Sequence, residues 1–149
     1  MMRILVATDG SDASNRAVEL AARLTKELKG HLKIIHVVTL RDWSLDQLHE
    51  YARWEHVTSG EVLSAFSEEN LRIARQRAEV LGVTDVESES LSESQIGEVA
   101  GSIIDAARRD NVDMVILGKR GRGRFTGLLL GSVSQKVVSV APCPVIVVP

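Results

Sequence analysis

The sequence predicts an α/β protein with an open five-stranded parallel sheet and helices on both faces. Short apolar runs, the pattern of strands buried on both sides, alternate along the chain with longer amphipathic segments. Strands and helices that alternate in this way form βαβ units, whose strands lie parallel in one sheet. The chain has 149 residues, of which 44% are hydrophobic and 26% charged. This size and balance are typical of one globular domain, which we expect to span residues 1–149.

The first two expected strands flank an amphipathic helix. Residues 4–8 (ILVAT) form a continuous apolar run, which indicates a buried strand. Residues 9–12 (DGSD) supply a turn and a helix N-cap, and residues 32–38 (LKIIHVV) form the second strand. We expect the helix between them to run from about Ala13 to Lys29 and to end at Gly30. Its apolar face carries Ala17, Leu20, Ala21, Leu24 and Leu28.

The middle of the chain predicts an irregular segment, a long helix and an edge strand. Residues 39–58 are expected to contain a short helix, because their large apolar residues have roughly helical spacing. These residues are Trp43, Leu45, Leu48, Tyr51 and Trp54. Residues 61–81 form a long amphipathic helix that Gly82 ends. Residues 83–91 alternate between apolar and polar side chains, which predicts a half-exposed edge strand.

The last part of the chain predicts two further helices and two strands. Residues 97–100 (GEVA) lead into a helix that ends near Arg109, and residues 112–117 (VDMVIL) form the next buried strand. A helix from Ser132 to about Val140 precedes the fifth strand at residues 145–148 (VIVV). Ser132 is the expected N-cap of that helix, and Gln135 would complete a capping box.

The composition argues against a secreted or membrane protein. The apolar run at the start meets Asp9 too early for a signal peptide, and no apolar run reaches about 18 residues. Cys143 is the only cysteine, so no intramolecular disulfide can form and a reducing compartment suits the chain. We therefore expect a cytoplasmic protein without a membrane partner.

Charge is distributed unevenly along the chain. The first 113 residues contain all 20 acidic side chains and 13 of the 18 Lys and Arg, a net charge of −7, while the remainder carries five cations and no acid. An acidic body with a basic C-terminal quarter suggests a local anion site rather than a nucleic-acid surface. On charge alone, a solvated basic loop is an equally good interpretation.

A glycine-rich segment points to phosphate as that anion. Five of the eleven glycines lie within residues 118–131, directly after a buried strand, where a missing Cβ lets a ligand approach the backbone. In open parallel sheets, ligands bind beyond the carboxyl ends of the strands. The free N–H groups of the helix that follows form a natural phosphate site, and the hydroxyls of Ser132 and Ser134 could add donors. Capping alone would also explain Ser132.

Two common nucleotide motifs are absent. The chain has no GxxxxGK[ST], so it lacks a Walker-type loop. Gly121, Gly123 and Gly127 give GxGxxxG, but after the fourth strand instead of the first and with no acidic residue downstream to hold a ribose. A dinucleotide-binding fingerprint is therefore excluded.

Several separated motifs instead resemble the universal stress protein family. Gly118-x2-Gly121-x9-Gly131-Ser132 is similar to the G-2x-G-9x-G-[S/T] signature of the ATP-binding branch of that family. The opening ILVATDGSD, the strand IIHVV, the GEVA segment and the closing GSVSQKVVSVAPCPVIVV agree in order and spacing. The resemblance covers nearly the whole chain, and residues 39–59 fall where the family varies.

The resemblance implies a Rossmann-like fold of the adenine nucleotide alpha hydrolase-like type, with strand order 3-2-1-4-5. It also implies a site for ATP, AMP or ADP. Asp9, Ala7 and Thr8 would lie at the adenosine end, the backbone of Val37 would read the adenine, and Leu117 and Gly118 would lie against the ribose. The residues around the phosphates would be Gly121, Gly131, Ser132, Val133 and Ser134. Taken alone, Asp9 is more often a turn or capping residue.

The phosphates would also attract cations. One or two of the basic side chains would pair with them, and the rest would be solvated. The candidates are Lys119, Arg120, Arg122 and Arg124. Mg²⁺ or Mn²⁺ would accompany the nucleotide, held mainly by phosphate oxygens rather than by protein ligands. His49 and His56 could suggest a metal face, but neither their spacing nor cysteines support one.

The last strand suggests a dimer. Its residues, Val145, Ile146, Val147 and Val148, are all apolar, yet the implied strand order puts them at an edge of the sheet. An exposed apolar edge promotes association. In the family this strand commonly pairs with its twin, so we expect a homodimer, unless a helix or the terminus covers the edge.

Three functions follow from these observations. The first is an ATP-binding regulatory module of the stress response. The second is an enzyme, with at most slow ATP hydrolysis or autophosphorylation of Thr126, Ser132 or Ser134, although no base is placed to activate water. A dimeric interaction module that binds no nucleotide is the third. Adenylate-forming enzymes are disfavoured, because residues 9–14 (DGSDAS) lack the paired glycines of their SGGxDS loop.

Overall fold

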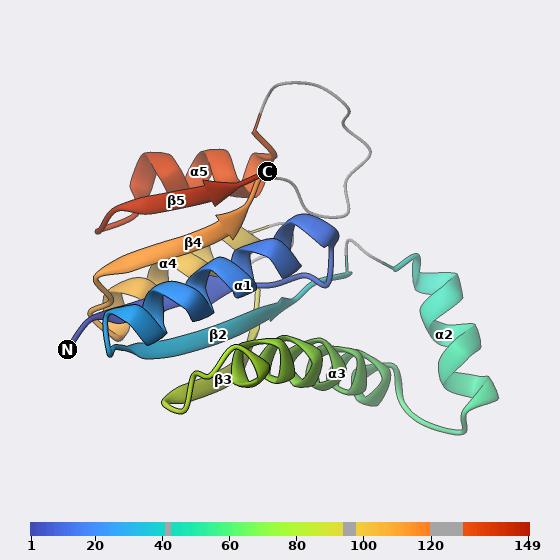
Figure 1. The fold of residues 1–149 in the computed structure, drawn as a ribbon. Coiled ribbons are helices and arrows are strands. Elements are labelled where there is room, and N and C mark those ends of the chain that lie inside the picture. The colour runs from blue at the N-terminus through green and yellow to red at the C-terminus, as the bar shows by residue number, and fades with distance from the viewer. Residues whose placement is uncertain (41–42, 94–97, 120–129) are drawn as a thin grey trace.

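The structure, a computed structural model, describes residues 1–40, 43–93, 98–119 and 130–149. It contains one five-stranded sheet in the order β3-β2-β1-β4-β5 (Figure 1). Every neighbouring pair is parallel. The expected fold class and strand order are therefore confirmed. The strands are β1 (Arg3–Ala7), β2 (His31–Val38), β3 (Val86–Ser92), β4 (Met114–Gly118) and β5 (Val145–Val148).

Helices pack on both faces of this sheet. Figure 1 shows α1 and α3 in front of the sheet and α4 and α5 behind it. The chain crosses from β1 to β2 over one face and from β3 to β4 over the other, so the strand order reverses at β1. The helices are α1 (Asp12–Glu27), α2 (Leu45–Trp54), α3 (Ser59–Val80), α4 (Val99–Arg109) and α5 (Ser132–Val140).

The core consists of two apolar layers, one on each face of the sheet. Ile4, Leu5 and Val6 of β1 are fully buried. Ile4 and Val6 pack with residues of α1 and α3, whereas Leu5 packs with residues of α4 and α5. Successive side chains of a strand point to opposite faces, so a continuous apolar run is what a strand covered on both sides requires.

The end of α1 differs in detail from the sequence expectation. Lys29, with φ 50°, takes the left-handed conformation that ends the helix, and Gly30 follows it. Gly30 has a different role, because a Cβ there would lie 2.4 Å from the carbonyl oxygen of Met2. Glycine at this position therefore lets the chain enter β2 close beside β1. Leu28, expected on the buried face, is 46% exposed because the helix has already ended there.

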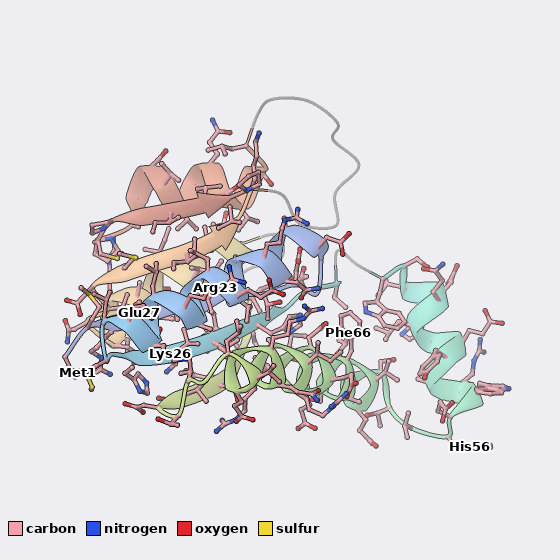
Figure 2. The ribbon with its side chains drawn as sticks, in the orientation of Figure 1. Met1, Arg23, Lys26, Glu27, His56 and Phe66 are labelled. Atoms are coloured by element: carbon pink, nitrogen blue, oxygen red, sulfur yellow. The ribbon has the colours of Figure 1, made fainter. Side chains whose placement is uncertain are left out.

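The expected short helix between β2 and α3 is present as α2. A capping box starts it, with Ser44 and Gln47 bonding each other's backbone N–H. Leu48 and Ala52 pack against the start of α3, while Figure 1 shows α2 standing apart from the sheet. Phe66 of α3 lies between α2 and the sheet (Figure 2). Its ring centroid is 6.0 Å from that of His36 on β2 and 5.8 Å from that of Trp43, which precedes α2.

The two edge strands of the sheet differ in polarity. β3 is the half-exposed edge strand that its alternating sequence predicted, and it is rich in Ser and Glu. β5 is the other edge, and its four apolar residues are only partly buried. Charged residues on an edge strand oppose pairing with further strands, so β3 is protected from association and β5 is not.

A buried lysine ties β2, β3 and α4 together near the amino ends of the strands. The Lys33 ammonium is 2.6 Å from Glu89, 2.8 Å from Asp110 and 3.2 Å from Glu87. Burial by itself would lower the pKa of Lys33, but the hydrogen bonds to these carboxylates outweigh it and the pKa is raised. The hydrogen bond from Arg109, assisted by Lys33, lowers the pKa of Asp110 from 3.8 to about 2. None of the helices in the described part of the chain combines the length and the hydrophobicity that a membrane-spanning helix needs.

This charge network predicts a loss of stability in acid. Because the pKa of Asp110 is depressed in the folded protein, its contribution is complete above about pH 4 and is lost as the pH falls toward 2. We expect Asp110→Asn to lower the free energy of unfolding at pH 7 by about 1 kcal/mol. Urea unfolding at pH 7 and pH 3 should show this difference shrinking at the lower pH.

Glu69→Gln is the matched control, because Glu69 forms an exposed ion pair with Arg72 within α3. Exposed pairs of this kind contribute little, so this variant should match the parent protein at pH 7. A difference between Asp110→Asn and the parent that is the same at both pH values would contradict a titrating role for Asp110.

Candidate functional site

The site predicted from sequence lies where the ends of β1 and β4 meet. All five strands are parallel, so their carboxyl ends share one edge of the sheet. β1 and β4 are neighbours, with Val6 paired to Ile116. From this point the chain leaves β1 into α1 on one face and reaches α5 on the other. In open parallel sheets, ligands bind at such a reversal, beyond the strand ends, and we refer to this place between the two connections as the crevice.

Hydroxyl groups organise the turn after β1. The Ser14 hydroxyl donates to the Ser11 carbonyl oxygen (3.0 Å) and lies 3.1 Å from the Thr8 hydroxyl. Since a hydroxyl has a single proton, Thr8 donates to Ser14 in this arrangement, and Gly10 N–H donates to Thr8 (3.2 Å). The Asp9 carboxylate accepts from Ser11 N–H (2.9 Å). Asp9 therefore has the turn role that its sequence position also suggested.

Gly118 has a packing role in addition to any ligand role. A Cβ at this position would lie 2.8 Å from the backbone nitrogen of Ser14 and 2.9 Å from the carbonyl carbon of Ala13. The end of β4 thus touches the backbone of the first turn of α1. The interpretation that glycine is required here only for ligand approach is incomplete, because the contact with α1 already excludes a side chain.

Gly131, rather than Ser132, is the N-cap of α5. Its φ and ψ of −63° and 160° are those of an N-cap, no side chain caps the helix, and Ser132 is the first helical residue. The expected capping box of Ser132 and Gln135 is therefore wrong. Gln135 N–H instead donates to the Gly131 carbonyl oxygen (2.9 Å). The helix begins one residue earlier than the capping pattern indicated.

The backbone of Lys119 connects β4, β5 and α5. Its N–H donates to the Val148 carbonyl oxygen (2.6 Å), and its carbonyl oxygen accepts from Gly131 N–H (3.0 Å). The hydroxyl of Ser134, which is 3% exposed, also donates to the Lys119 carbonyl oxygen (2.8 Å). These bonds fix the end of β4 and the beginning of α5 against each other.

The first turn of α5 contains backbone N–H groups that have no hydrogen-bond acceptor among the described residues. Among residues 1–40, 43–93, 98–119 and 130–149, none accepts a hydrogen bond from the backbone N–H of Ser132, Val133 or Ser134. By contrast, side-chain hydroxyls cap α1, α2 and α3. Free N–H groups at a helix N-terminus, together with the helix dipole, favour an anion.

Most of the predicted site residues lie around this crevice. Thr8 and Leu117 are buried beneath it, and Val37 is buried near the end of β2, beside β1. At the strand ends and the start of α5, the structure brings together Ala7, Thr8, Asp9, Leu117, Gly118, Lys119, Gly131, Ser132, Val133 and Ser134. Gly121, Arg120, Arg122 and Arg124 lie outside the described residues.

Sequence reasoning missed Ser14, which is 4% exposed and holds the turn after β1. Its position three residues after the N-cap Ser11 was the available signal, because a serine in a first turn can bond back to the backbone of the cap.

No protein metal centre is visible in the part of the chain that the structure describes. There, no three His, Cys, Asp or Glu side chains come together as metal ligands. His49 lines a hollow of about 550 Å³ along α2 together with Asp46, Glu50 and Arg53. His56 lies beyond α2, at the far end of that helix from the sheet (Figure 2).

The fold is a doubly wound α/β sheet, and among the described residues no side chain caps the N-terminus of α5 at its carboxyl edge. The sequence matches the Universal stress protein family over residues 1–149. The chain therefore belongs to the universal stress protein family.

Individual relatives agree with this assignment. The chain is 31% identical to Universal stress protein YxiE of Bacillus subtilis, over 98% of this chain and 97% of the relative. Among solved structures, it resembles Universal stress protein UspA from Lactobacillus plantarum with a TM-score of 0.76, 26% identity and coverage of 99% and 97% of the two chains. It also resembles a universal stress protein in complex with cAMP, with a TM-score of 0.70, 25% identity and coverage of 99% and 95%.

The contact at Gly118 predicts that a side chain there destabilises the fold. We expect Gly118→Ala to lower the free energy of unfolding by about 1–3 kcal/mol, because the backbone of the α1 turn must move to admit a Cβ. Gly60→Ala is the matched control, since a Cβ there meets nothing closer than 3.9 Å and alanine favours the helix. Urea unfolding of both variants measures the difference, and equal stabilities would contradict the packing role of Gly118.

Proposed function

We propose that the chain binds an adenine nucleotide, ATP in particular, in the crevice between the ends of β1 and β4. The observation that carries the proposal is the uncapped start of α5, where three backbone N–H groups face no protein acceptor among the described residues. The spacing Gly118-x2-Gly121-x9-Gly131-Ser132 supports it, because it is the signature expected of ATP-binding universal stress proteins. The relative solved in complex with cAMP supports an adenine nucleotide more generally.

Each part of the nucleotide has a matching set of residues in this proposal. The adenosine end lies beside Ala7, Thr8 and Asp9, with the backbone of Val37 reading the adenine. Leu117 and Gly118 border the ribose. The phosphates lie at the first turn of α5, near Gly131 and Val133, where the exposed Ser132 hydroxyl can donate to them.

Cations complete the proposed site. A triphosphate favours pairing with one or two of the four basic side chains at positions 119, 120, 122 and 124. Mg²⁺ or Mn²⁺ would neutralise the phosphates and bridge their oxygens, and the described residues supply no cluster of three ligands that would hold the ion by themselves. Discrimination between ATP and AMP would come from these contacts to the β- and γ-phosphates.

The biological role that follows is a nucleotide-dependent regulatory module of the stress response, cytoplasmic and formed by one domain. The phosphate end of the proposed site is built from backbone N–H groups and hydroxyls, and the carboxylate among its described residues, Asp9, lies at the adenosine end, away from the phosphates. Binding and release of ATP, rather than turnover, would then change the affinity of the protein for its partners.

Calorimetric titration of the nucleotide-free protein tests the proposal. We expect ATP with Mg²⁺ to bind with a Kd in the micromolar range or tighter, and AMP to bind more weakly because it lacks the β- and γ-phosphates. Gly131→Val should weaken ATP binding at least about tenfold. Its melting temperature should fall by only a few degrees, because the φ and ψ of Gly131 suit any residue although valine is a poorer N-cap than glycine. Failure of the parent protein to bind either nucleotide would refute the proposal.

We also propose that β5 pairs with its counterpart in a second copy of the chain. β5 is an apolar edge strand bonded to β4 on one side, and its residues are only partly buried. A partner strand would satisfy the outer backbone groups of β5 and remove its apolar side chains from water.

A charge on β5 should separate the two copies. Val147→Asp is expected to give a monomer by light scattering, since two carboxylates would face each other across the paired strands. Thr84→Asp, exposed and just before the opposite edge strand, should leave the dimer intact. A Val147→Asp protein that is folded by circular dichroism and still dimeric would place the interface elsewhere.

A further inference from the structure

Two serines in the first turn of α5 are in different environments. Ser132 is exposed, and its hydroxyl makes no hydrogen bond to the described residues. Ser134, two positions later, is 3% exposed and donates to the Lys119 carbonyl oxygen (2.8 Å). The Gly131 carbonyl oxygen is a second, longer partner at 3.2 Å. Sequence reasoning had treated the two hydroxyls as equivalent phosphate donors.

The number of protons on each hydroxyl distinguishes the roles of Ser132 and Ser134. A serine hydroxyl has one proton, and a phosphate oxygen that lacks a proton only accepts hydrogen bonds. For Ser134 to bind phosphate, its hydroxyl would have to release the carbonyl oxygen of Lys119. The loss of a buried hydrogen bond would oppose that exchange. Ser132 has no such bond to release.

We propose that Ser134 is a positioning residue of the nucleotide site, whereas Ser132 keeps the role of phosphate donor given above. This inference rests on the proposed nucleotide binding. The Ser134 hydroxyl holds the end of β4 to the first turn of α5 through the Lys119 carbonyl oxygen. Gly131 N–H donates to the same oxygen (3.0 Å), so a hydroxyl and an amide share one acceptor.

The effect of Ser134 extends to β5. Lys119 N–H donates to the Val148 carbonyl oxygen (2.6 Å), so the peptide groups on both sides of Lys119 are engaged. Removing the Ser134 hydroxyl leaves Gly131 N–H as the remaining bond from α5 to the Lys119 carbonyl oxygen within the described residues. The start of α5 would then be free to move relative to the crevice, and its N–H groups would no longer converge on a phosphate.

Amide hydrogen exchange of Gly131 in the nucleotide-free protein tests the positioning role directly. Ser134→Ala should raise the exchange rate of this amide at least about tenfold, because the shared acceptor is no longer held in place. Ser132→Ala should leave the rate within about twofold. Ser139→Ala is a matched control on the same helix, since the Ser139 hydroxyl donates to the Gln135 carbonyl oxygen (2.9 Å) away from the crevice.

Titration with ATP and with adenosine completes the test. Ser134→Ala and Ser132→Ala should each weaken ATP binding about tenfold and leave adenosine binding within about twofold, because adenosine has no phosphate. Ser139→Ala should change neither affinity. Ser134→Cys keeps the side-chain volume while weakening the donor, so it repeats the test if the alanine variant does not fold.

Three results would overturn the proposal. If Ser134→Ala weakens ATP binding without changing Gly131 exchange, Ser134 contacts phosphate directly. A general role in stability would appear as equal losses for ATP and adenosine with a lower melting temperature. Unchanged exchange and unchanged affinity would leave Ser134 without a role in the site. If the parent protein does not bind ATP at all, the proposed function fails, and the exchange measurement still decides whether Ser134 holds Lys119.

Discussion

The parallel pairing of β1 with both β2 and β4 is the constraint on which the remaining structure depends. A strand with parallel neighbours on each side needs crossover helices, and these cover both faces. Ile4, Leu5 and Val6 are accordingly fully buried. The same arrangement places the ends of β1 and β4 side by side and opens the crevice between their connections. The contact of Gly118 with the first turn of α1 shows how closely the two connections approach.

Around that crevice, most polar groups already bond one another, so ligand binding depends on the few that remain. The hydroxyls of Thr8, Ser14 and Ser134 each use their single proton within the protein, because an unpaired buried donor costs about 1–3 kcal/mol. Within the described part of the chain, the N–H groups of the first α5 turn and the Ser132 hydroxyl are left without a partner. A site made of backbone donors is suited to hold phosphate rather than to transform it.

The distribution of charge agrees with the proposed binding of a nucleotide. Lys33 neutralises carboxylates of β3 and α4 near the amino ends of the strands, at the opposite end of the sheet from the crevice. The excess of acid in the first 113 residues is therefore partly paired at that end, while the carboxyl edge carries Lys119 and leads into the basic segment. The two edge strands also differ in charge, since β3 carries charged side chains and β5 is apolar.

The sequence by itself determined the class of fold, the number and kind of the strands, the presence of α2 and the half-exposed character of β3. Each of these depends on local burial and conformational preference, which leave a periodic pattern in the chain. Only the tertiary structure decided that Gly118 packs against α1, that Gly131 caps α5, and that the Ser134 hydroxyl is bonded while that of Ser132 has no partner among the described residues. Lys33 and Asp110, 77 positions apart, likewise form a contact that no periodicity indicates. These features depend on distances between separate elements, and packing sets such distances after the elements have formed.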